Sequence, residues 1–325
     1  MKLPRRNFLH LAAGAASLPA VSRIARAQAY PTRPIRLIVG FSAGGGSETP
    51  ARLIGQWLSQ RLDQQFVIEN RPGAGTNIAT EAVVRAKPDG YTLLWVTPPN
   101  AINATLYDKL NFNFIRDIAP VASILRQPNV MVAHPSFPAK TIPEFIALAK
   151  AHPAEINMAS PGIGTSQHLT GELLKMMAGI DVTHVPYRGG ALAMTDLLGG
   201  QVQVAFVTLL AAIEYVRLGK LHALAVTSAS RAEALPDVPT VGESVPGFEA
   251  SSFYGVGAPK GTPAEIIDKL NKEVQAALID PKLKVQLAGL GATALAGSPA
   301  EFGKFVADET EKWGKVVKFV GIKAD

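Results

Sequence analysis

Short apolar runs alternate with segments of helical periodicity along most of the chain. The apolar runs, which are typical of buried strands, lie at 35–39, 66–68, 92–96, 129–133, 156–160, 182–186, 202–207, 223–227 and 252–257. Apolar residues recur with the spacing of a helix face at 50–62, 76–86, 143–151, 167–178, 191–198, 210–218, 263–279, 282–289 and 299–318. This alternation predicts an α/β fold with largely parallel sheets.

The first 27 residues have the layout of an export signal. Arg5 and Arg6 open it, a mostly apolar stretch follows, and Ala25, Arg26 and Ala27 form a small-x-small cleavage site. The apolar stretch is shorter than the roughly 18–20 residues that cross a bilayer, so it does not predict a transmembrane helix. The paired arginines resemble a twin-arginine signal, while a general secretory signal and a frayed helix of a cytosolic protein remain as alternatives. We therefore expect export to the periplasm with cleavage near Ala27.

The basic character of the chain comes from this segment. The formal net charge is +6, but residues 1–27 hold five basic residues and no acidic one, which leaves 27 basic against 26 acidic residues in the rest. A nearly neutral remainder gives no support to binding of nucleic acid or of a membrane surface. The chain has no cysteine, which excludes disulfides, thiolate metal ligands and a lipid-modified cysteine. We expect a soluble periplasmic protein.

A glycine-rich loop joins the first predicted strand to the first predicted helix and reads GFSAGGGSETPARL over residues 40–53. It departs from a dinucleotide fingerprint at Thr49, where the third glycine would lie, and it lacks the Lys-Ser or Lys-Thr pair of a P-loop. Glu48 would repel a pyrophosphate, and the hydrolase elbow Gly-x-Ser-x-Gly also fails at Thr49. Nucleotide binding and hydrolysis are poorly supported. We expect Thr49 to cap the helix, with Pro50 as its first residue.

A second loop of the same build lies downstream, in INMASPGIGTSQHLTGELLK, residues 156–175. Ser160 ends the predicted strand, Gly162 and Gly164 form the turn, and Thr165 or Ser166 can cap the next helix. Helix N-termini present unpaired N–H groups and a partial positive charge, so two of them facing each other could hold a carboxylate. Either loop alone is better explained as an ordinary strand–helix turn, but two such loops in successive lobes favour a ligand cleft.

Six longer motifs carry a family resemblance. They are YPTRPIRLIVGFSAGGGSETPARL, VIENRPGAGTNIATEAVVRAKPDGYTLLW, SPGIGTSQHLTGELLK, HVPYRGGALAMTDLLGGQVQVAF, LHALAVTSASRAEALPDVPTVGES and APKGTPAEIIDKLN. Together they resemble the Bug-type receptors, the periplasmic substrate-binding subunits of tripartite tricarboxylate transporters. The resemblance extends from Tyr30 to Ile322 and so covers nearly all of the chain that follows the export signal.

The resemblance implies a two-lobed, type II periplasmic-binding-protein fold of the α/β class, with a ligand cleft between the lobes. The stretches SILRQPNVMVAHP and FEASSFYGVGAP are expected to cross between them, which gives 28–128 plus 250–325 as lobe one and 129–249 as lobe two. In this family, loops that match Phe41–Glu48 and Ser160–His168 clamp a small carboxylate through backbone amides and bridging waters. We expect the lobes to close around the ligand as on a hinge.

The expected ligand-binding residues come from both loops and from the ends of other strands. Asn77 could line the cleft or cap its helix, Pro98 could line it or rigidify a turn, and His168 could donate to the anion. The full set is Phe41, Ser42, Ala43, Gly44, Gly45, Ser47, Glu48, Asn77, Thr97, Pro98, Ser160, Gly162, Gly164, Thr165, Ser166, His168, Val207 and Thr208. The histidines are scattered along the chain, so we expect no metal and no cofactor.

Departures from the family pattern bear on the ligand. Relatives often carry Asp at the position of Glu48 and acids at the positions of Gln203 and Val207. Burying an ammonium group without a paired acid is costly. The departures therefore predict a carboxylate without an α-amino group, either an aliphatic di- or hydroxy-acid or an aromatic acid.

The favoured function is a monomeric receptor that delivers its carboxylate to the membrane subunits of a transporter. A sensor that reports the ligand to a sensor kinase is compatible with this function. The alternative from another class is an exported hydrolase with Ser47 or Ser166 as nucleophile. It would need an oriented base, and the sequence offers no readable Ser–His–acid set.

Overall fold

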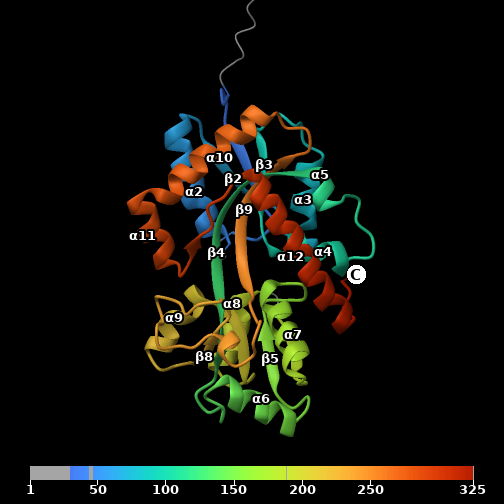
Figure 1. The fold of residues 1–325 in the computed structure, drawn as a ribbon, viewed down its shortest axis with the longest axis vertical. Helices are drawn as coiled ribbons and strands as arrows, with labels where there is room; N and C mark the ends of the chain where they lie inside the picture. The colour runs from blue at the N-terminus through green and yellow to red at the C-terminus, as the bar shows by residue number, and fades with distance from the viewer. Residues whose placement is uncertain (1–29, 44–46, 188, 325) are drawn as a thin grey trace, which may run out of the picture. The chain divides into compact units, whose positions relative to one another are not determined.

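One long strand, β4 (Ile118–Ala133), takes part in two sheets of the computed structural model. The structure describes residues 30–43, 47–187 and 189–324, so the export signal expected at 1–27 lies outside it. The first part of β4 pairs with β9 (Ser251–Pro259), from Ile118↔Pro259 to Pro128↔Ser251. Its last residues pair with other strands, and Figure 1 shows β4 running from the upper group of elements to the lower one.

The first sheet combines parallel and antiparallel strands. Its order is β2 (Phe66–Asn70), β1 (Ile35–Val39), β3 (Thr92–Val96), β9 and β4, with β10 (Thr293–Ala294) on the other edge of β4. β1 is parallel to both β2 and β3, whereas β9 is antiparallel to both β3 and β4. β1 and β3 are almost wholly buried, as expected of parallel strands covered by helices on both faces.

The second sheet begins where the first one ends. From Asn129 to Ala133, β4 pairs antiparallel with β7 (Val204–Thr208) on one side and, from Val130, with β8 (His222–Val226) on the other. β5 (Asn157–Ser160) runs parallel to β7, and β6 (Thr183–Pro186) runs parallel to β5. Both sheets therefore contain parallel strands whose carboxyl ends lead into loops and helices.

Helices follow most of the strands and cover the sheets. They are α2 (Glu48–Leu62), α3 (Asn77–Val84), α4 (Pro98–Leu106), α5 (Phe114–Asp117), α6 (Ile142–Ala151), α7 (Ser166–Ala178), α8 (Gly190–Leu198), α9 (Leu209–Arg217), α10 (Ala264–Ile279), α11 (Pro281–Gly289) and α12 (Pro299–Val320). Two short 3₁₀ helices lie at Ala74–Thr76 and Val241–Glu243. From Arg33 onward the chain forms one compact unit.

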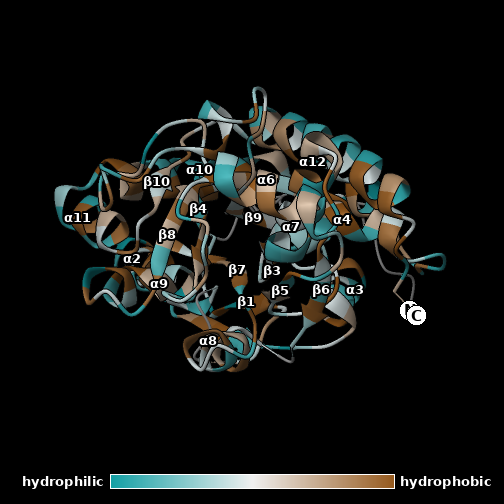
Figure 2. Cartoon of the chain, turned by 90° about the horizontal axis from the view of Figure 1, so that it is seen from below, coloured by the Kyte–Doolittle hydropathy of each residue, from teal (hydrophilic) through white to brown (hydrophobic). Residues whose placement is uncertain are grey.

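The last helix, α12, links the cores beside the two sheets. Its Phe302 packs with Phe253 of β9 in one apolar cluster. Its Trp313, which is fully buried, joins a second cluster that includes Phe206 of β7. In Figure 2, α12 alternates brown and teal along its length, as expected of an amphipathic helix. A reciprocal capping box at its start, with Ser298 as the N-cap, and Gly321 in the left-handed region at its end fix its limits.

The α/β fold predicted from the sequence is confirmed, and every predicted strand and helix is present within a few residues of its expected bounds. No strand was predicted for residues 118–128 of β4, although the stretch 123–135 was expected to cross between the lobes. The elements α4, α5 and β10 were not predicted either. The missed part of β4 contains Pro120 and Pro128 and has two register shifts against β9, so its apolar alternation is broken. Among the residues that the structure describes, no helix could span a membrane.

Candidate ligand site

The expected ligand-binding loops lie at the carboxyl ends of parallel strands in both sheets. The loop after β1 leads into α2, and the loop after β5 leads into α7. In open α/β sheets, ligands bind in the crevice outside these strand ends. Gly44 and Gly45 of the first loop fall outside the described residues.

The first loop enters its helix earlier than predicted. α2 begins at Glu48 with Ser47 as its N-cap, so the expectation that Thr49 would cap the helix and Pro50 would open it was wrong. Phe41 is partly exposed, and its carbonyl oxygen accepts a hydrogen bond of 2.9 Å from Asn70 Nδ2, which holds the loop to the end of β2. Ser42 and Ala43, which follow Phe41, are exposed.

Glu48 is buried, and its negative charge is balanced by an ion pair with Arg52. Arg52, one turn further along α2, donates from Nε to Glu48 Oε1 at 2.9 Å and also donates from its terminal nitrogen. A carboxylate in the first turn of a helix is also favoured by the helix dipole. The negative charge of Glu48 is therefore already met within its own helix.

A second contact brings the loop after β2 against the first loop. A Cβ placed on Gly40 would lie 2.5 Å from Thr76 Cβ, so this approach requires glycine. Ser47 Oγ and Thr76 Oγ1 are both buried, and neither has a hydrogen-bond partner among the described residues. Two hydroxyl groups beside the first loop thus remain unused by the described part of the protein.

The second loop has the conformation that its glycines suggested. Gly162 (φ 143°) and Gly164 (φ 76°) both adopt positive φ. Thr165 is the N-cap of α7, since its side chain accepts a 3.3 Å hydrogen bond from the His168 amide. Thr165 Oγ1 also donates to the Gly162 carbonyl at 2.7 Å. The predicted turn and cap are confirmed.

The side chain of His168 is buried against the backbone of the second loop. Its side chain is 2% exposed, and its Nδ1 accepts a 3.2 Å hydrogen bond from the Gly164 amide. Its ring stacks on that of His184, with centroids 3.8 Å apart, and His184 Nε2 lies 2.6 Å from Ser160 Oγ. This geometry does not support the expectation that His168 donates to the anion, because its side chain is buried and bonded to the loop backbone.

Both imidazoles are neutral at ordinary pH. Burial, together with His184 and Lys175, lowers the pKa of His168 to about 3. Burial and Lys175 lower the pKa of His184 to about 4. Burial raises the pKa of the neighbouring Glu172, whose Oε2 lies 3.1 Å from Lys175 Nζ. A neutral His168 leaves Nδ1 free to accept the amide of Gly164.

The second loop touches elements of the first sheet. A Cβ on Gly164 would lie 2.5 Å from Leu106 Cδ2, at the end of α4. Ser166 Oγ, at the start of α7, lies 2.9 Å from Ser252 Oγ of β9. The structure therefore brings the start of α7 next to the strand that runs between β3 and β4.

Asn77 and Thr97 belong to a polar network between α3 and α4 that also contains Thr80, Asn100 and Asn103. Asn103 Nδ2 donates to Asn77 Oδ1 at 2.8 Å, and Asn100 Oδ1 accepts from the Thr97 amide at 2.7 Å. Pro98 is buried as the first residue of α4, so Pro98 opens a helix instead of rigidifying a turn. Asn103, which holds the side chain of Asn77, was not marked by the sequence.

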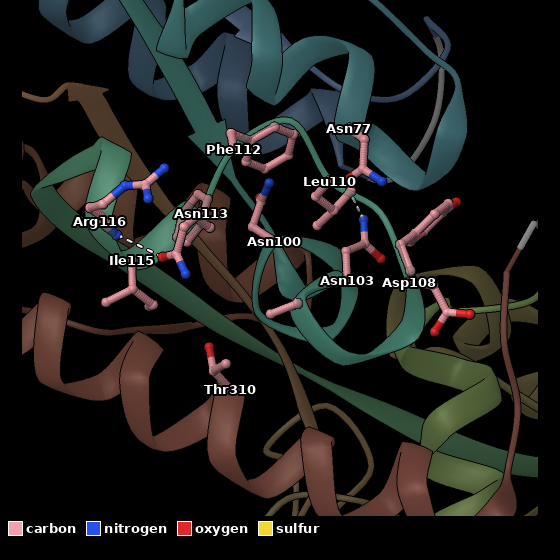
Figure 3. A pocket seen from close by; sticks show the side chains of 13 residues that line it. Asn77, Asn100, Asn103, Asp108, Leu110, Phe112, Asn113, Ile115, Arg116 and Thr310 are labelled. Carbon is pink, nitrogen blue, oxygen red and sulfur yellow. Dashed lines mark hydrogen bonds between the residues drawn. The ribbon is translucent and has the colours of Figure 1, made fainter.

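A cavity of about 420 Å³ lies beside this network and is shown in Figure 3. Of the expected site residues, it is lined by Asn77 alone. Its other polar lining residues are Asn100, Asn103, Tyr107, Asp108, Asn113, Arg116 and Thr310. The cavity therefore opens among α3, α4, α5 and α12, and no described residue of the two glycine-rich loops lines it.

The structure places Val207 and Thr208 at the end of β7 in different surroundings. Val207 is 4% exposed and packs with Val130 in the apolar core of the second sheet, so its side chain is a core residue. Thr208 precedes α9 and lies directly opposite Asn129 of β4. Asn129 is fully buried, and neither atom of its side-chain amide has a hydrogen-bond partner among the described residues. An asparagine directly before the apolar run VMVA is the sequence signal for it.

The geometry gives no support to the hydrolase alternative. Ser166 is bonded to Ser252, and Ser47 has no partner in the described part of the chain. Ser160 does approach His184, but no carboxylate among the described residues hydrogen-bonds to that imidazole. Within the same residues, no group of three or more His, Asp or Glu side chains could hold a metal ion.

Known proteins resemble this chain over most of its length. Residues 51–322 match the family described as tripartite tricarboxylate transporter family receptor. Protein BugT of Bordetella pertussis is 36% identical over 91% of this chain and 92% of its own. The structure is similar to that of R. palustris Rpa4515 with adipate, with a TM-score of 0.83 and 38% identity over 90% of this chain and 99% of that one. It is also similar to MatC from Rhodopseudomonas palustris with bound malate, with a TM-score of 0.79 and 33% identity over 89% of this chain and 100% of that one.

Proposed function

Because the chain belongs to the tripartite tricarboxylate transporter family of receptors, which are periplasmic solute-binding proteins and not enzymes, we propose that it binds a small aliphatic dicarboxylate or hydroxy-acid between its two glycine-rich loops. The observation that carries this proposal is the placement of those loops. Each follows a parallel strand of a different sheet, and each opens a helix. The first-turn amides of α2 and α7 can therefore meet a carboxylate from two sides.

The binding energy that such donors provide is sufficient. Charge-assisted hydrogen bonds contribute roughly 1.5–3 kcal/mol each, and micromolar affinity corresponds to about 8 kcal/mol. In α7, the cap at Thr165 engages the amide of His168. The amides of Ser166 and Gln167 come before it and remain available to a ligand. A few donors of this kind from each loop supply most of the affinity, and no arginine or lysine needs to contact the ligand.

We further propose the division into lobes that the family resemblance implied. Lobe one would comprise 28–128 plus 250–325, and lobe two would comprise 129–249. The boundary at 128/129 coincides with the change of pairing partner along β4, from β9 to β7. Closure of one lobe on the other would bring the two loops together around the ligand.

Export, delivery and signalling complete the proposal. The segment with Arg5 and Arg6 would direct export to the periplasm and be removed near Ala27. The loaded receptor would act as a monomer and hand its carboxylate to the membrane subunits of a tripartite tricarboxylate transporter. Genes for those subunits next to this one support transport, whereas a neighbouring sensor-kinase gene supports a signalling role.

A thermal-shift experiment with adipate and malate tests the function. A ligand at 100 times its dissociation constant stabilises the folded state by roughly 2.7 kcal/mol, so we expect a clear rise in melting temperature. The matched control is 1,6-hexanediol, which has the carbon chain of adipate without the carboxylates. The absence of a shift with a panel of di-, hydroxy- and aromatic acids, or an equal shift with the diol, contradicts carboxylate binding.

Malate and aspartate form a pair that tests the ligand class, because they differ only in a hydroxyl against an ammonium group. We expect malate to bind at least tenfold more tightly by calorimetry, which corresponds to roughly 1.4 kcal/mol. Glu48 is already paired with Arg52, and Val207 provides no acid at the end of β7, so a buried ammonium would lack a partner. Tighter binding of aspartate than of malate and succinate would disprove this expectation.

A further inference from the structure

We propose that His168 and His184 are positioning residues that hold the loop Ser160–Thr165 in its ligand-binding shape, without contacting the ligand themselves. The proposal rests on the proposed function, since it assigns this loop to the carboxylate. It changes the expected role of His168 from a ligand donor to a support. It also gives a role to His184, which the sequence did not mark as part of the site.

The loop needs such a support because its backbone conformation is unusual. Gly162 and Gly164 are only two residues apart, and both have positive φ. Glycine residues sample many other conformations in an unfolded chain, so fixing two glycines in one conformation costs conformational entropy. A loop of this kind adopts one shape only where several contacts specify it.

His184 fixes the first half of the loop through Ser160. Its Nε2 lies 2.6 Å from Ser160 Oγ, which in turn accepts from the Gly162 amide and donates to the Gly162 carbonyl, both at 3.2 Å. One imidazole thereby orients a hydroxyl that bonds both backbone groups of the glycine. Loss of His184 would leave the Ser160 hydroxyl without its shortest contact.

His168 fixes the second half of the loop. Its Nδ1 accepts the Gly164 amide at 3.2 Å, and its own amide donates to Thr165 Oγ1 at 3.3 Å. Because the amide of Gly164 is turned inward, it is not one of the donors available to a ligand. The cap at Thr165 engages the amide of His168, so the amides of Ser166 and Gln167 at the start of α7 remain as donors.

The stack of the two rings joins these halves. The centroids lie 3.8 Å apart with an angle of 17° between the planes, so a shift of one ring displaces the other. The charged groups nearest to the pair are Glu172, whose Oε1 lies 3.7 Å from His168 Nε2, and Lys175, which also approaches Asp181. α12 packs against the same region with the apolar Trp313 and Val316. Residues of α7 and α12 therefore pack around the histidine pair, which contacts the loop on its buried side.

Two substitutions of His168 separate positioning from bulk packing. In His168→Asn, the side-chain oxygen can replace Nδ1 as acceptor for the Gly164 amide. In His168→Leu, an apolar side chain of similar size fills the space but offers no acceptor. We expect His168→Leu to weaken adipate and malate binding at least tenfold by calorimetry at pH 7, and His168→Asn to stay within about threefold of the wild type. The exposed His152, changed to Leu, is the matched control and should bind as the wild type does.

Hydrogen exchange of the ligand-free protein tests the positioning without any ligand. A peptide covering residues 160–166 should exchange slowly in the wild type and in His168→Asn, and at least tenfold faster in His168→Leu. If His168→Leu fails to fold, His184→Phe, which keeps a ring for the stack but loses the contact with Ser160, replaces it in both measurements. Equal exchange and equal affinity in the leucine and asparagine variants would overturn the proposal. Failure of the wild type to bind any carboxylate would instead refute the proposed function, and the exchange data would still decide the role of the pair.

Discussion

Lowering the pH from 7 to 5 is expected to destabilise the folded protein by about 2–4 kcal/mol through His168 and His184. Burial holds the pKa of these groups at about 3 and about 4 in the folded state, whereas an unfolded histidine titrates near 6.5. Below pH 6.5 the unfolded chain therefore binds more protons than the folded chain, and stability falls with pH until the folded pKa is reached. Each pH unit below 6.5 costs about 1.4 kcal/mol per histidine. Burial raises the pKa of Glu172, which offsets part of this loss.

Between pH 7 and pH 5, the change in stability that comes from the histidines can be measured separately from the change that comes from surface carboxylates. Hydrogen bonds from Arg116 and Arg231 lower the pKa of Asp117 and Glu243 to about 2, so the stability that these acids contribute is lost only at lower pH. Thermal unfolding at the two pH values, compared between wild type, His184→Gln and His152→Gln, provides the test. We expect His184→Gln to show a smaller pH effect and His152→Gln the wild-type effect. An unfolding free energy that is equal at pH 5 and pH 7 would contradict the burial of neutral imidazoles.

Substitution of Gly164 is expected to weaken carboxylate binding at least tenfold, or roughly 1.4 kcal/mol. In Gly164→Ala, the new Cβ would lie 2.5 Å from Leu106 Cδ2, and the φ of 76° is strained for any residue with a side chain. Gly164→Pro should be more severe, because proline cannot reach that φ and removes the amide that His168 accepts. Both changes displace the loop that leads into α7.

Gly179 at the other end of α7 is the matched control for Gly164. It too has a positive φ, of 61°, but a Cβ placed there would meet no atom within 4 Å. Gly179→Ala should therefore cost stability through backbone strain alone and leave the affinity for adipate or malate unchanged. If calorimetry shows the same affinity for a folded Gly164→Ala protein as for Gly179→Ala, the second loop does not belong to the ligand site.

The local features of the fold were readable from the sequence because they depend on neighbouring residues. The capping role of Thr165 followed from its place before an apolar helical stripe. The turn at Gly162 and Gly164 followed from the need for positive φ. α4 was not readable, because PPNAINATL begins with two prolines and contains asparagines that gain their favourable energy only from tertiary partners such as Thr80.

The parts of the site that the sequence could not reveal depend on residues distant along the chain. His184 follows His168 by a helix, a turn and part of a strand, and only the pairing of β5 with β6 brings the two rings together. The pairing of Arg52 with Glu48 follows helical spacing and could have been predicted, yet the burial that makes it important depends on the fold. Val207 was expected at the ligand because relatives often carry an acid at its position, but strand alternation turns its side chain toward the core.

The continuity of β4 limits how this protein can be divided into independent modules. Pro128 pairs with Ser251 in one sheet, and the very next residue, Asn129, pairs with Thr208 in the other. A gene fragment that starts or stops at this point would cut a single strand and leave unpaired edges on both products, which favours aggregation. Truncated versions for crystallisation or biosensors should therefore keep residues 118–133 intact, and reporter insertions belong in exposed turns such as the one at Gly219.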